Sequence, residues 1–365
     1  MIKHSDHFHG SDLESIEKVY GIKKEDIVSF SANVNPLGIS PKLKSTLSER
    51  IDSIMSYPDR EYTTLRKRIA EYVRTDFENV IVGNGSTELI SLFIHIKHPK
   101  KALIIGPTYS EYEREVSLGG GVTHYYRLEE ENNFTLDIHK LDIELTSDVE
   151  LLVICNPNNP TSTAITRNEM RKILDICKQK GIFVMVDETY VEFAEDVFKI
   201  TSAPLTGYYN NIIILRGISK FFAAPGLRLG YAICGNVDLL KEMNQRKNPW
   251  TINSLAAIAG EIMFTDEGYI KETRTLIANE RDRICKIFDG CKNVQYFTPT
   301  ANFILIKILK EDVTSMDLFE AAIKKGLMIR DCSTFPFLNN KFIRFCFMTP
   351  ELNDALLEVL LEVLK

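Results

Sequence analysis

A lysine stands in an apolar stretch of the chain, where a charged side chain needs a reason. The stretch LRGISKFFAAPGLRLGYAI, residues 215–233, places Lys220 between Ser219 and two phenylalanines, with Arg228 eight residues further on. A lysine withdrawn from water has a lowered pKa, because burial disfavours the ammonium form, and its neutral amine can act as a nucleophile or a base. A single lysine is more simply explained as a side chain whose ammonium group reaches solvent. The interpretation of Lys220 therefore depends on its companions.

An acidic side chain also follows an apolar stretch, where its charge needs an explanation. In the run IFVMVDETY, Asp187 follows five apolar residues, and Tyr190 comes three positions after it. An ionised carboxylate in such surroundings is costly unless it meets a cation. The pattern therefore predicts a cationic partner for Asp187, with Tyr190 near the same place.

Polar residues also follow three other strand-like runs. In GNGSTELI, Gly85 permits a tight turn, and Ser86 and Thr87 begin a helix whose free backbone donors suit an anion; a capped helix after a glycine turn is the simpler alternative. Tyr109, after KALIIGP, can lie flat on a planar ligand, or it can simply pack. In NPNNPTS two prolines fix the backbone and leave Asn159 as an amide donor, unless the segment is a bare turn.

One ligand would use all of these residues. Pyridoxal phosphate has a planar ring, a cationic ring nitrogen, a phenolate oxygen, a phosphate and an aldehyde. Each group finds a partner of matching chemistry in the sequence: Tyr109 for the ring face, Asp187 for the ring nitrogen, Asn159 and Tyr190 for the phenolate, Ser86, Thr87, Ser219 and Arg228 for the phosphate, and Lys220 for the aldehyde.

The elements that must position these residues can be read from the strand pattern. Seven β-rich runs alternate with helix-like stretches, namely NVIVGNG, KALIIGP, VTHYYRL, ELLVICNP, IFVMVDE, NIIILRG and GYAICG. This order predicts a three-layer αβα fold with a mostly parallel seven-stranded sheet. In such sheets ligands gather at the carboxyl ends of the strands, which is where the polar residues stand.

A second, smaller α+β domain is expected after the large one. The runs ANFILIKI, LMIRD and KFIRFCF supply three more strands, and PELNDALLEVLLEVL supplies a closing amphipathic helix. We expect a large cofactor-binding domain over residues 35–255, and a small domain built from residues 1–34 and 256–365. Clefts between domains are common ligand sites.

Composition excludes several classes of protein. The chain has 365 residues, and its 44 basic against 50 acidic residues give a net charge of −6, the wrong sign for a nucleic-acid binder. No apolar run suits a secretory signal or a membrane span, so we expect a cytoplasmic protein without a membrane partner. The seven cysteines form no CxxC pair, and His4, His7 and His9 lack acidic or cysteine partners at ligand spacing, so we expect no metal.

The motif order resembles a known family. GNGSTE, PTY, CNPNNPT, VDETY, SKFFAAPGLRLG and a late FIRF are similar to the fold-type I pyridoxal-phosphate enzymes, in the histidinol-phosphate aminotransferase branch, from about residue 27 to the end. FSANVNPLG, YPDREY, PGLRLGY and PWTINSLAAIAGE are closer still to the threonine-phosphate decarboxylases of cobalamin biosynthesis. The resemblance implies the fold and the cofactor, pyridoxal 5′-phosphate, and leaves the reaction open.

The resemblance also implies roles, position by position. Lys220 would form the Schiff base, Asp187 would keep the ring nitrogen protonated, and Tyr190 would complete the catalytic set. Tyr57, in the YPD turn, would reach the cofactor phosphate of a neighbouring subunit, which implies a homodimer. Arg344 in FIRF would hold the substrate carboxylate. The remaining cofactor-binding and substrate-binding candidates are Gly85, Ser86, Thr87, Tyr109, Asn159, Ser219 and Arg228 for the cofactor, and Arg330, Asn33 and His9 for the substrate.

Two departures from the family pattern bear on the reaction. The decarboxylases begin with a His-Gly-Gly-Asn segment, whereas this chain has HFHGSD, and the carboxylate of Asp12 would repel a substrate phosphate. Gly217 stands where relatives often carry Ser or Thr, so one phosphate contact is expected to be missing. We therefore favour transamination of a small amino acid or amine, phosphorylated or not, over decarboxylation of a phosphorylated hydroxy-amino acid.

Two other classes of protein are weaker alternatives. A non-catalytic pyridoxal-phosphate binder would not need Lys220 as a reactive amine. A nucleotide-binding protein using GNGST would be expected to carry GxxxxGK[ST] or GxGxxG, and the chain has neither.

Overall fold

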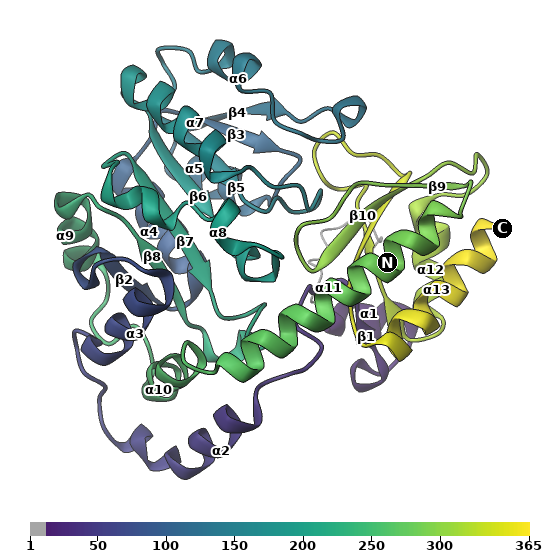
Figure 1. The fold of residues 1–365 in the computed structure, drawn as a ribbon, viewed down its shortest axis with the longest axis horizontal. Helices are drawn as coiled ribbons and strands as arrows, with labels where there is room; N and C mark the ends of the chain where they lie inside the picture. The colour runs from purple at the N-terminus through teal and green to yellow at the C-terminus, as the bar shows by residue number, and fades with distance from the viewer. Residues whose placement is uncertain (1–11) are drawn as a thin grey trace.

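The large sheet contains the seven strands that the sequence predicts (Figure 1). The computed structural model describes residues 12–365. The strands lie in the order β2-β8-β7-β6-β5-β3-β4, and only β8 runs antiparallel to its neighbours. Their bounds are β2 Val80–Gly83, β3 Lys101–Gly106, β4 Val122–Arg127, β5 Leu151–Cys155, β6 Phe183–Asp187, β7 Ile212–Gly217 and β8 Gly230–Ile233. The expectation of a mostly parallel sheet is confirmed.

The central strands are apolar because both of their faces are covered. Every residue of β5, β6 and β7 is buried, as expected for a parallel sheet between two helical layers. Side chains alternate between the faces: in β7, Ile212 and Ile214 join one core cluster, and Ile213 and Leu215 join the other. Asp187 continues the alternation of Phe183 and Met185, so it lies on the second of these faces.

Helices form the two outer layers. One face carries α4 Gly85–Lys97, α5 Glu111–Leu118 and α9 Val237–Arg246, whose buried residues share one core cluster. The other face is covered by α3 Thr63–Val73, α6 Ile138–Glu144 and α7 Arg167–Lys180, with the short α8 Val197–Ile200 nearby. Helix α7 begins at a capping box of Thr166 and Glu169 and ends at Gly181, which has φ +72°.

The C-terminal part forms a second sheet, four-stranded and antiparallel, in the order β12-β13-β10-β9. The remaining elements are α1 Leu13–Tyr20, β1 Val28–Ser29, α2 Pro41–Glu49, α10 Ser254–Met263, α11 Glu267–Asp289, β9 Val294–Tyr296, β10 Phe303–Ile308, α12 Ser315–Ile323, β11 Leu327–Met328, β12 Arg330–Asp331, β13 Phe342–Cys346 and α13 Pro350–Leu364. Short 3-10 helices are η1 Lys24–Asp26, η2 Ile51–Met55, η3 Phe77–Asn79, η4 Glu130–Asn132, η5 Val191–Phe193, η6 Ala203–Gly207 and η7 Pro225–Leu227.

The N-terminal strand joins the C-terminal part. β1 pairs in parallel with β11, Val28 opposite Leu327, and α11 runs from the large sheet toward the second sheet (Figure 1). This pairing supports our proposal of a large domain over residues 35–255 and a small one from residues 1–34 and 256–365. Within the described residues, no helix has both the length and the apolar character required to cross a membrane.

Candidate active site

Lys220 and Asp187 stand at the same edge of the large sheet. Strands β6 and β7 are parallel neighbours, with Asp187 opposite Leu215, so their carboxyl ends meet. Lys220 follows β7 in a turn, and its Nζ donates a hydrogen bond to the carbonyl oxygen of Ala32, at 2.7 Å. Burial, and then the positive charge of Arg344, lower the pKa of Lys220 to about 8. This amine therefore loses its proton far more readily than an exposed lysine.

Asp187 is buried and held by three donors. Its side chain is 4% exposed; Oδ1 accepts from the backbone N and the hydroxyl of Thr189, at 2.9 and 2.6 Å, and Oδ2 accepts from the hydroxyl of Tyr112, at 2.7 Å. Burial raises the pKa of Asp187, although these bonds oppose the shift. Within residues 12–365 no cationic side chain forms an ion pair with it, so a cationic ring nitrogen would supply the missing charge.

An aromatic pair lies beside Asp187. The ring of Tyr109 meets the ring of Tyr112 edge-on, with centroids 5.6 Å apart and an interplanar angle of 86°. Burial, together with the carboxylates of Glu111 and Asp187, raises the pKa of Tyr109 to about 12, and the guanidinium of Arg228 opposes this. Tyr109 thus lies within electrostatic reach of both the acid and the arginine, as a stacking residue would.

The start of α4 forms a cradle with Arg228. Gly85 has φ +81°, and a Cβ built there would lie 2.5 Å from Nη2 of Arg228, so the guanidinium lies against the first turn of the helix. A Cβ at Gly230 would lie 2.2 Å from the backbone N of Ser86. Ser86 and Thr87 follow in the same turn, where backbone donors have no partner within the helix. This donor set suits a phosphate.

Asn159 and Tyr190 reach the site from two further loops. Oδ1 of Asn159 accepts a hydrogen bond from Nη1 of Arg344, which leaves the amide NH2 group for a ring oxygen. The hydroxyl of Tyr190 accepts from Nδ2 of Asn33, at 3.4 Å, and burial raises the pKa of Tyr190. Ser219 lies half-buried beside Lys220 in the turn after β7.

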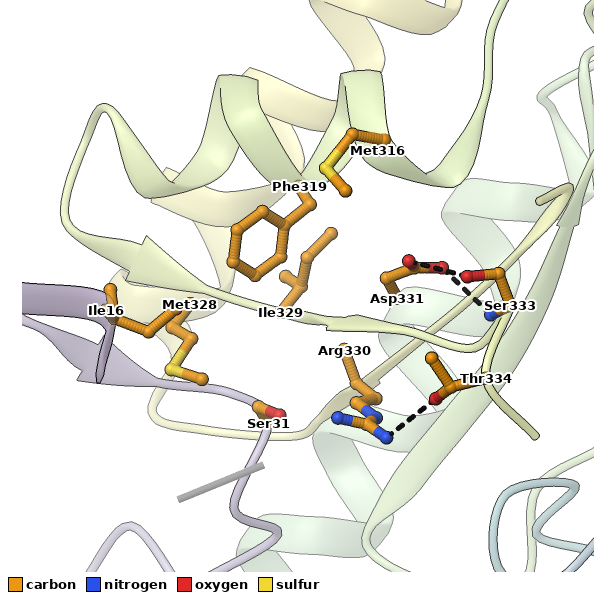
Figure 2. A pocket seen from close by; sticks show the side chains of 10 residues that line it. All are labelled: Ile16, Ser31, Met316, Phe319, Met328, Ile329, Arg330, Asp331, Ser333 and Thr334. Carbon is orange, nitrogen blue, oxygen red and sulfur yellow. Dashed lines mark hydrogen bonds between the residues drawn. The ribbon is translucent and has the colours of Figure 1, made fainter. Parts of the chain in front are cut away.

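Two arginines lie opposite each other on neighbouring strands of the second sheet. Arg344 on β13 and Arg330 on β12 are register partners. Arg344 is 4% exposed and donates through Nη2 to the carbonyl oxygen of Ser31, at 2.7 Å. Arg330 donates to the hydroxyl of Thr334, at 3.0 Å, and lines a cavity of about 270 Å³ together with Ser31 (Figure 2). Burial and the charge of Arg344 lower the pKa of Arg330.

Not every predicted residue joins this group. Tyr57 is 81% exposed, and its ring lies 4.8 Å from that of Trp250, so it takes no part in the site within one chain. His9, His4 and His7 fall outside the described residues. Sequence reasoning missed Tyr112 and Thr189, the donors to Asp187; the signal for Tyr112 was its place three residues after Tyr109, in the first turn of the helix that follows.

The fold and this edge of the sheet define a class of protein. An amine, a buried acid that no described cationic side chain pairs with, an aromatic face and an anion cradle lie at the carboxyl edge of a mostly parallel sheet, and together they fit pyridoxal phosphate group by group. The arrangement is that of the fold-type I pyridoxal-phosphate enzymes.

Comparison with known proteins identifies the family. The family model described as aminotransferase class I and II matches residues 25–360, and the chain belongs to this family. Its members depend on pyridoxal phosphate and act on small amino substrates.

Relatives of two activities resemble the chain. The "Putative threonine-phosphate decarboxylase" of Caldanaerobacter subterraneus is 37% identical over 90% of this chain and 88% of that protein. The threonine-phosphate decarboxylase of Salmonella typhimurium is 30% identical over 98% and 96%. The crystal structure of a histidinol-phosphate aminotransferase from Clostridium acetobutylicum is 31% identical, covers 91% of this chain and 97% of its own, and has a TM-score of 0.85.

Proposed function

We propose that the protein decarboxylates a phosphorylated hydroxy-amino acid of the threonine-phosphate class. The observation that carries this is the placement of Arg330 opposite Arg344 on paired strands. Guanidinium groups bind carboxylates and phosphates through paired, charge-assisted hydrogen bonds. A substrate with both a carboxylate and a phosphate supplies two anionic groups, and the two relatives named as threonine-phosphate decarboxylases support this substrate class.

The contacts of Asp12 weaken the sequence-based argument for transamination. From the sequence, the Asp12 carboxylate is expected to repel a substrate phosphate. Asp12 instead stands at the N-cap of α1, where Oδ1 accepts from the backbone N of Ser15, at 3.2 Å, and Oδ2 accepts from its hydroxyl, at 2.8 Å. Helix capping accounts for an acid at this position, and decarboxylation is therefore our first candidate.

The chain's own residues would divide the work as follows. Bound pyridoxal phosphate supplies an electron sink for the bond that breaks at Cα. Arg344 would bind the substrate carboxylate and, with Asn159 fixing its guanidinium, orient the substrate and so select the Cα bond that breaks. Arg330 binds the phosphate. Asp187 keeps the ring nitrogen protonated, and Nζ of Lys220 delivers a proton to Cα after carbon dioxide has left.

Transamination is the second candidate, and one observation favours it. The histidinol-phosphate aminotransferase structure matches with a TM-score of 0.85 at 31% identity. The same Lys220 amine would then move a proton from Cα to the cofactor carbon, instead of only giving one.

A product assay separates the two. The loaded enzyme is incubated with phosphothreonine, phosphoserine and common amino donors, with a keto acid as acceptor. We expect carbon dioxide and the corresponding amine phosphate without new keto acid, and Arg330→Gln should lose this activity on phosphorylated substrates. New keto acid without carbon dioxide would instead establish transamination.

We also propose that the enzyme is a homodimer. Ile54, Met55 and Tyr57 in and after η2, together with Trp250, form a patch of exposed apolar side chains, which we call the η2 patch. Exposed apolar groups gathered in this way are typical of an interaction surface. A second copy seated on this surface would bring Tyr57 toward its cofactor phosphate, as the family resemblance implies.

A further inference from the structure

Tyr112 holds the acid of the candidate cofactor site. It is the second residue of α5, and its side chain is fully buried. Its hydroxyl donates to Oδ2 of Asp187, at 2.7 Å, whereas both bonds to Oδ1 come from Thr189. Among the described residues, Tyr112 is therefore the one side chain that donates a hydrogen bond to Oδ2, the oxygen that Thr189 does not hold.

The same side chain contacts the candidate stacking residue. The ring edge of Tyr112 meets the ring of Tyr109, with centroids 5.6 Å apart. Both tyrosines follow β3: Tyr109 lies just before α5, and Tyr112 lies in its first turn. One residue thus touches the group that would face the cofactor ring and the group that would meet its nitrogen.

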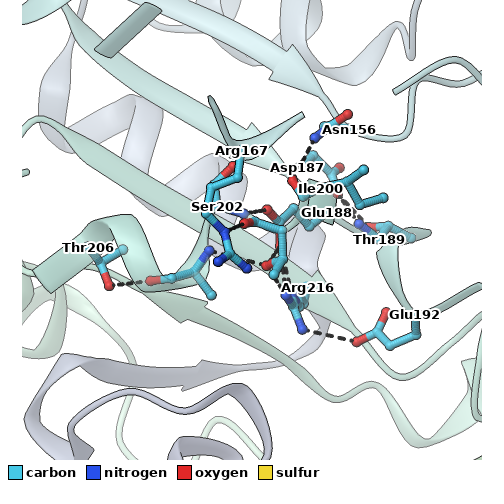
Figure 3. A network of polar contacts seen from close by, with 12 residues as sticks. Asn156, Arg167, Asp187, Glu188, Thr189, Glu192, Ile200, Ser202, Thr206 and Arg216 are labelled. Carbon is cyan, nitrogen blue, oxygen red and sulfur yellow. Dashed lines mark hydrogen bonds and ion pairs between the residues drawn. The ribbon is translucent and has the colours of Figure 1, made fainter. Parts of the chain in front are cut away.

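The backbone of Asp187 is fixed independently of Tyr112. The backbone N of Asn156 donates to the carbonyl oxygen of Asp187, at 2.8 Å. On the opposite face of the sheet, Glu188 accepts from Arg216 at 2.7 Å and from the backbone N of Ser202 (Figure 3). Removing the Tyr112 hydroxyl would therefore change the environment of the carboxylate without releasing the strand that carries it.

We infer that Tyr112 is a positioning residue for the cofactor, which aims Oδ2 of Asp187 at the ring nitrogen and keeps the carboxylate ionised. This inference rests on the proposed role of Asp187. A hydrogen bond to a carboxylate favours its charged form, and a charged Asp187 in turn favours a protonated ring nitrogen. The electron sink for the reaction is then stronger.

Several other groups also face Asp187, and their charges enter any titration. Cys155 lies on the neighbouring strand β5, and Tyr109 and Tyr190 approach from their loops. Glu188, directly after Asp187, acts from the opposite face of the sheet, where its charge raises the pKa of Asp187. Of these groups, Cys155 also forms a side-chain hydrogen bond with Tyr112, and Tyr112→Phe removes that bond as well.

The test compares Tyr112→Phe with a matched control, Tyr125→Phe. The control loses a hydroxyl that donates to Glu113 at 3.0 Å, away from Asp187. The cofactor is labelled with ¹⁵N in its ring, and the ¹⁵N chemical shift of the bound cofactor reports whether that nitrogen is protonated. We expect Tyr112→Phe to move the shift toward neutral pyridine and to weaken cofactor binding about tenfold or more.

Substrate turnover gives a separate readout. In Tyr112→Phe we expect kcat to fall with little change in KM, because the substrate arginines are untouched. An unchanged ¹⁵N shift and cofactor affinity would overturn the inference. Absence of turnover in the wild type would count against the proposed function alone, since the ¹⁵N shift is read without substrate.

A second variant covers the case in which Tyr112→Phe does not fold. Tyr112→3-fluorotyrosine keeps the shape of the side chain and makes the phenol a stronger donor. We expect its ¹⁵N shift to move further toward the protonated ring than in the wild type. A ¹⁵N shift in the opposite direction would contradict the proposed role of the hydroxyl. So would an unchanged ¹⁵N shift, when the ring nitrogen is only partly protonated in the wild type.

Discussion

At the scale of single residues, burial acts in opposite directions on the two central groups of the site. It lowers the pKa of Lys220 and raises that of Asp187, and in both cases the charged form is the one disfavoured. The protein without cofactor therefore contains two groups whose ionisation opposes folding. Each gives a stability test that needs no substrate.

Lys220→Met should change stability in a pH-dependent way. The folded pKa, about 8, lies below the ordinary value of 10.5. The stability that Lys220 contributes is thus present above pH 10.5 and is lost as the pH falls through 8. We expect the cofactor-free variant to be more stable than wild type at pH 7, with the difference shrinking by up to roughly 3 kcal/mol toward pH 10.5. Urea unfolding across this range measures it; a constant difference would count against a buried amine.

Asp187→Asn should separate stability from cofactor binding. Because the folded pKa of Asp187 is raised, its contribution to stability is present below the unfolded pKa and is lost as the pH rises through the folded value. At pH 8 the cofactor-free variant should unfold at a higher temperature than the cofactor-free wild type. Its cofactor affinity should fall at least tenfold, since the ring nitrogen loses its anionic partner. If the cofactor raised the unfolding temperature of both proteins equally, this would contradict the pairing of Asp187 with the ring nitrogen.

At the scale of elements, a row of glycines makes room for the anion cradle. Gly83, Gly230 and Gly217 are register partners across β2, β8 and β7. A Cβ at Gly230 would collide with the first turn of α4, whereas a Cβ at Gly217 would lie 3.5 Å from the Ser86 hydroxyl, an ordinary contact. The contact that the sequence comparison predicted to be missing can therefore be supplied without strain.

Gly217→Ser should strengthen cofactor binding. The new hydroxyl would lie near Ser86 and could donate to the phosphate, and a hydrogen bond to a charged group is worth about 1.5 kcal/mol or more. We expect an affinity gain of up to about tenfold in a titration of the cofactor-free protein. Gly217→Ala is the matched control, because it adds the same Cβ without a donor. Equal affinities in the two variants would exclude a phosphate contact at this position.

The sequence predicts some elements well and others poorly, for physical reasons. β5, β6 and β7 are buried on both faces, so their apolar runs are unbroken and their ends are marked by Asn156, Asp187 and the turn before Lys220. β9 was not predicted, because it is a three-residue edge strand with one buried residue, Val294. The run LMIRD divides into β11 and β12, which pair with different sheets, and no local pattern encodes a partner so distant in the chain.

The candidate site shows the same difference between residues that a local motif marks and residues whose contacts are distant in the sequence. Motifs following the strands placed Lys220, Asp187 and Asn159 at one edge of the sheet. The bond from Tyr112 to Asp187 joins residues 75 positions apart, and a tyrosine in an amphipathic helix looks like a packing residue. Asp12 shows that a local role can also be overlooked: its contacts in the described structure are those of a helix cap.

At the scale of the whole molecule, the η2 patch leaves large apolar side chains in water. Met55 is 83% exposed and Tyr57 81% exposed. If a second copy covers them, Met55→Glu should place a charge in the interface, and we expect a monomer with weakened cofactor binding. Ile143→Glu, at a residue 79% exposed on α6, is the control and should stay dimeric. Light scattering measures the assembly; a dimeric Met55→Glu protein would place the interface elsewhere.

The pairing of β1 with β11 determines which strands can pair first while the chain is synthesised on the ribosome. Every strand of the seven-stranded sheet has been synthesised by Ile233, so that sheet can assemble while later residues are still being added. Val28 must wait for Leu327 to emerge before its strand has a partner, and Arg344 comes later still. The nascent chain thus acquires its reactive amine well before the arginine that would grip a substrate.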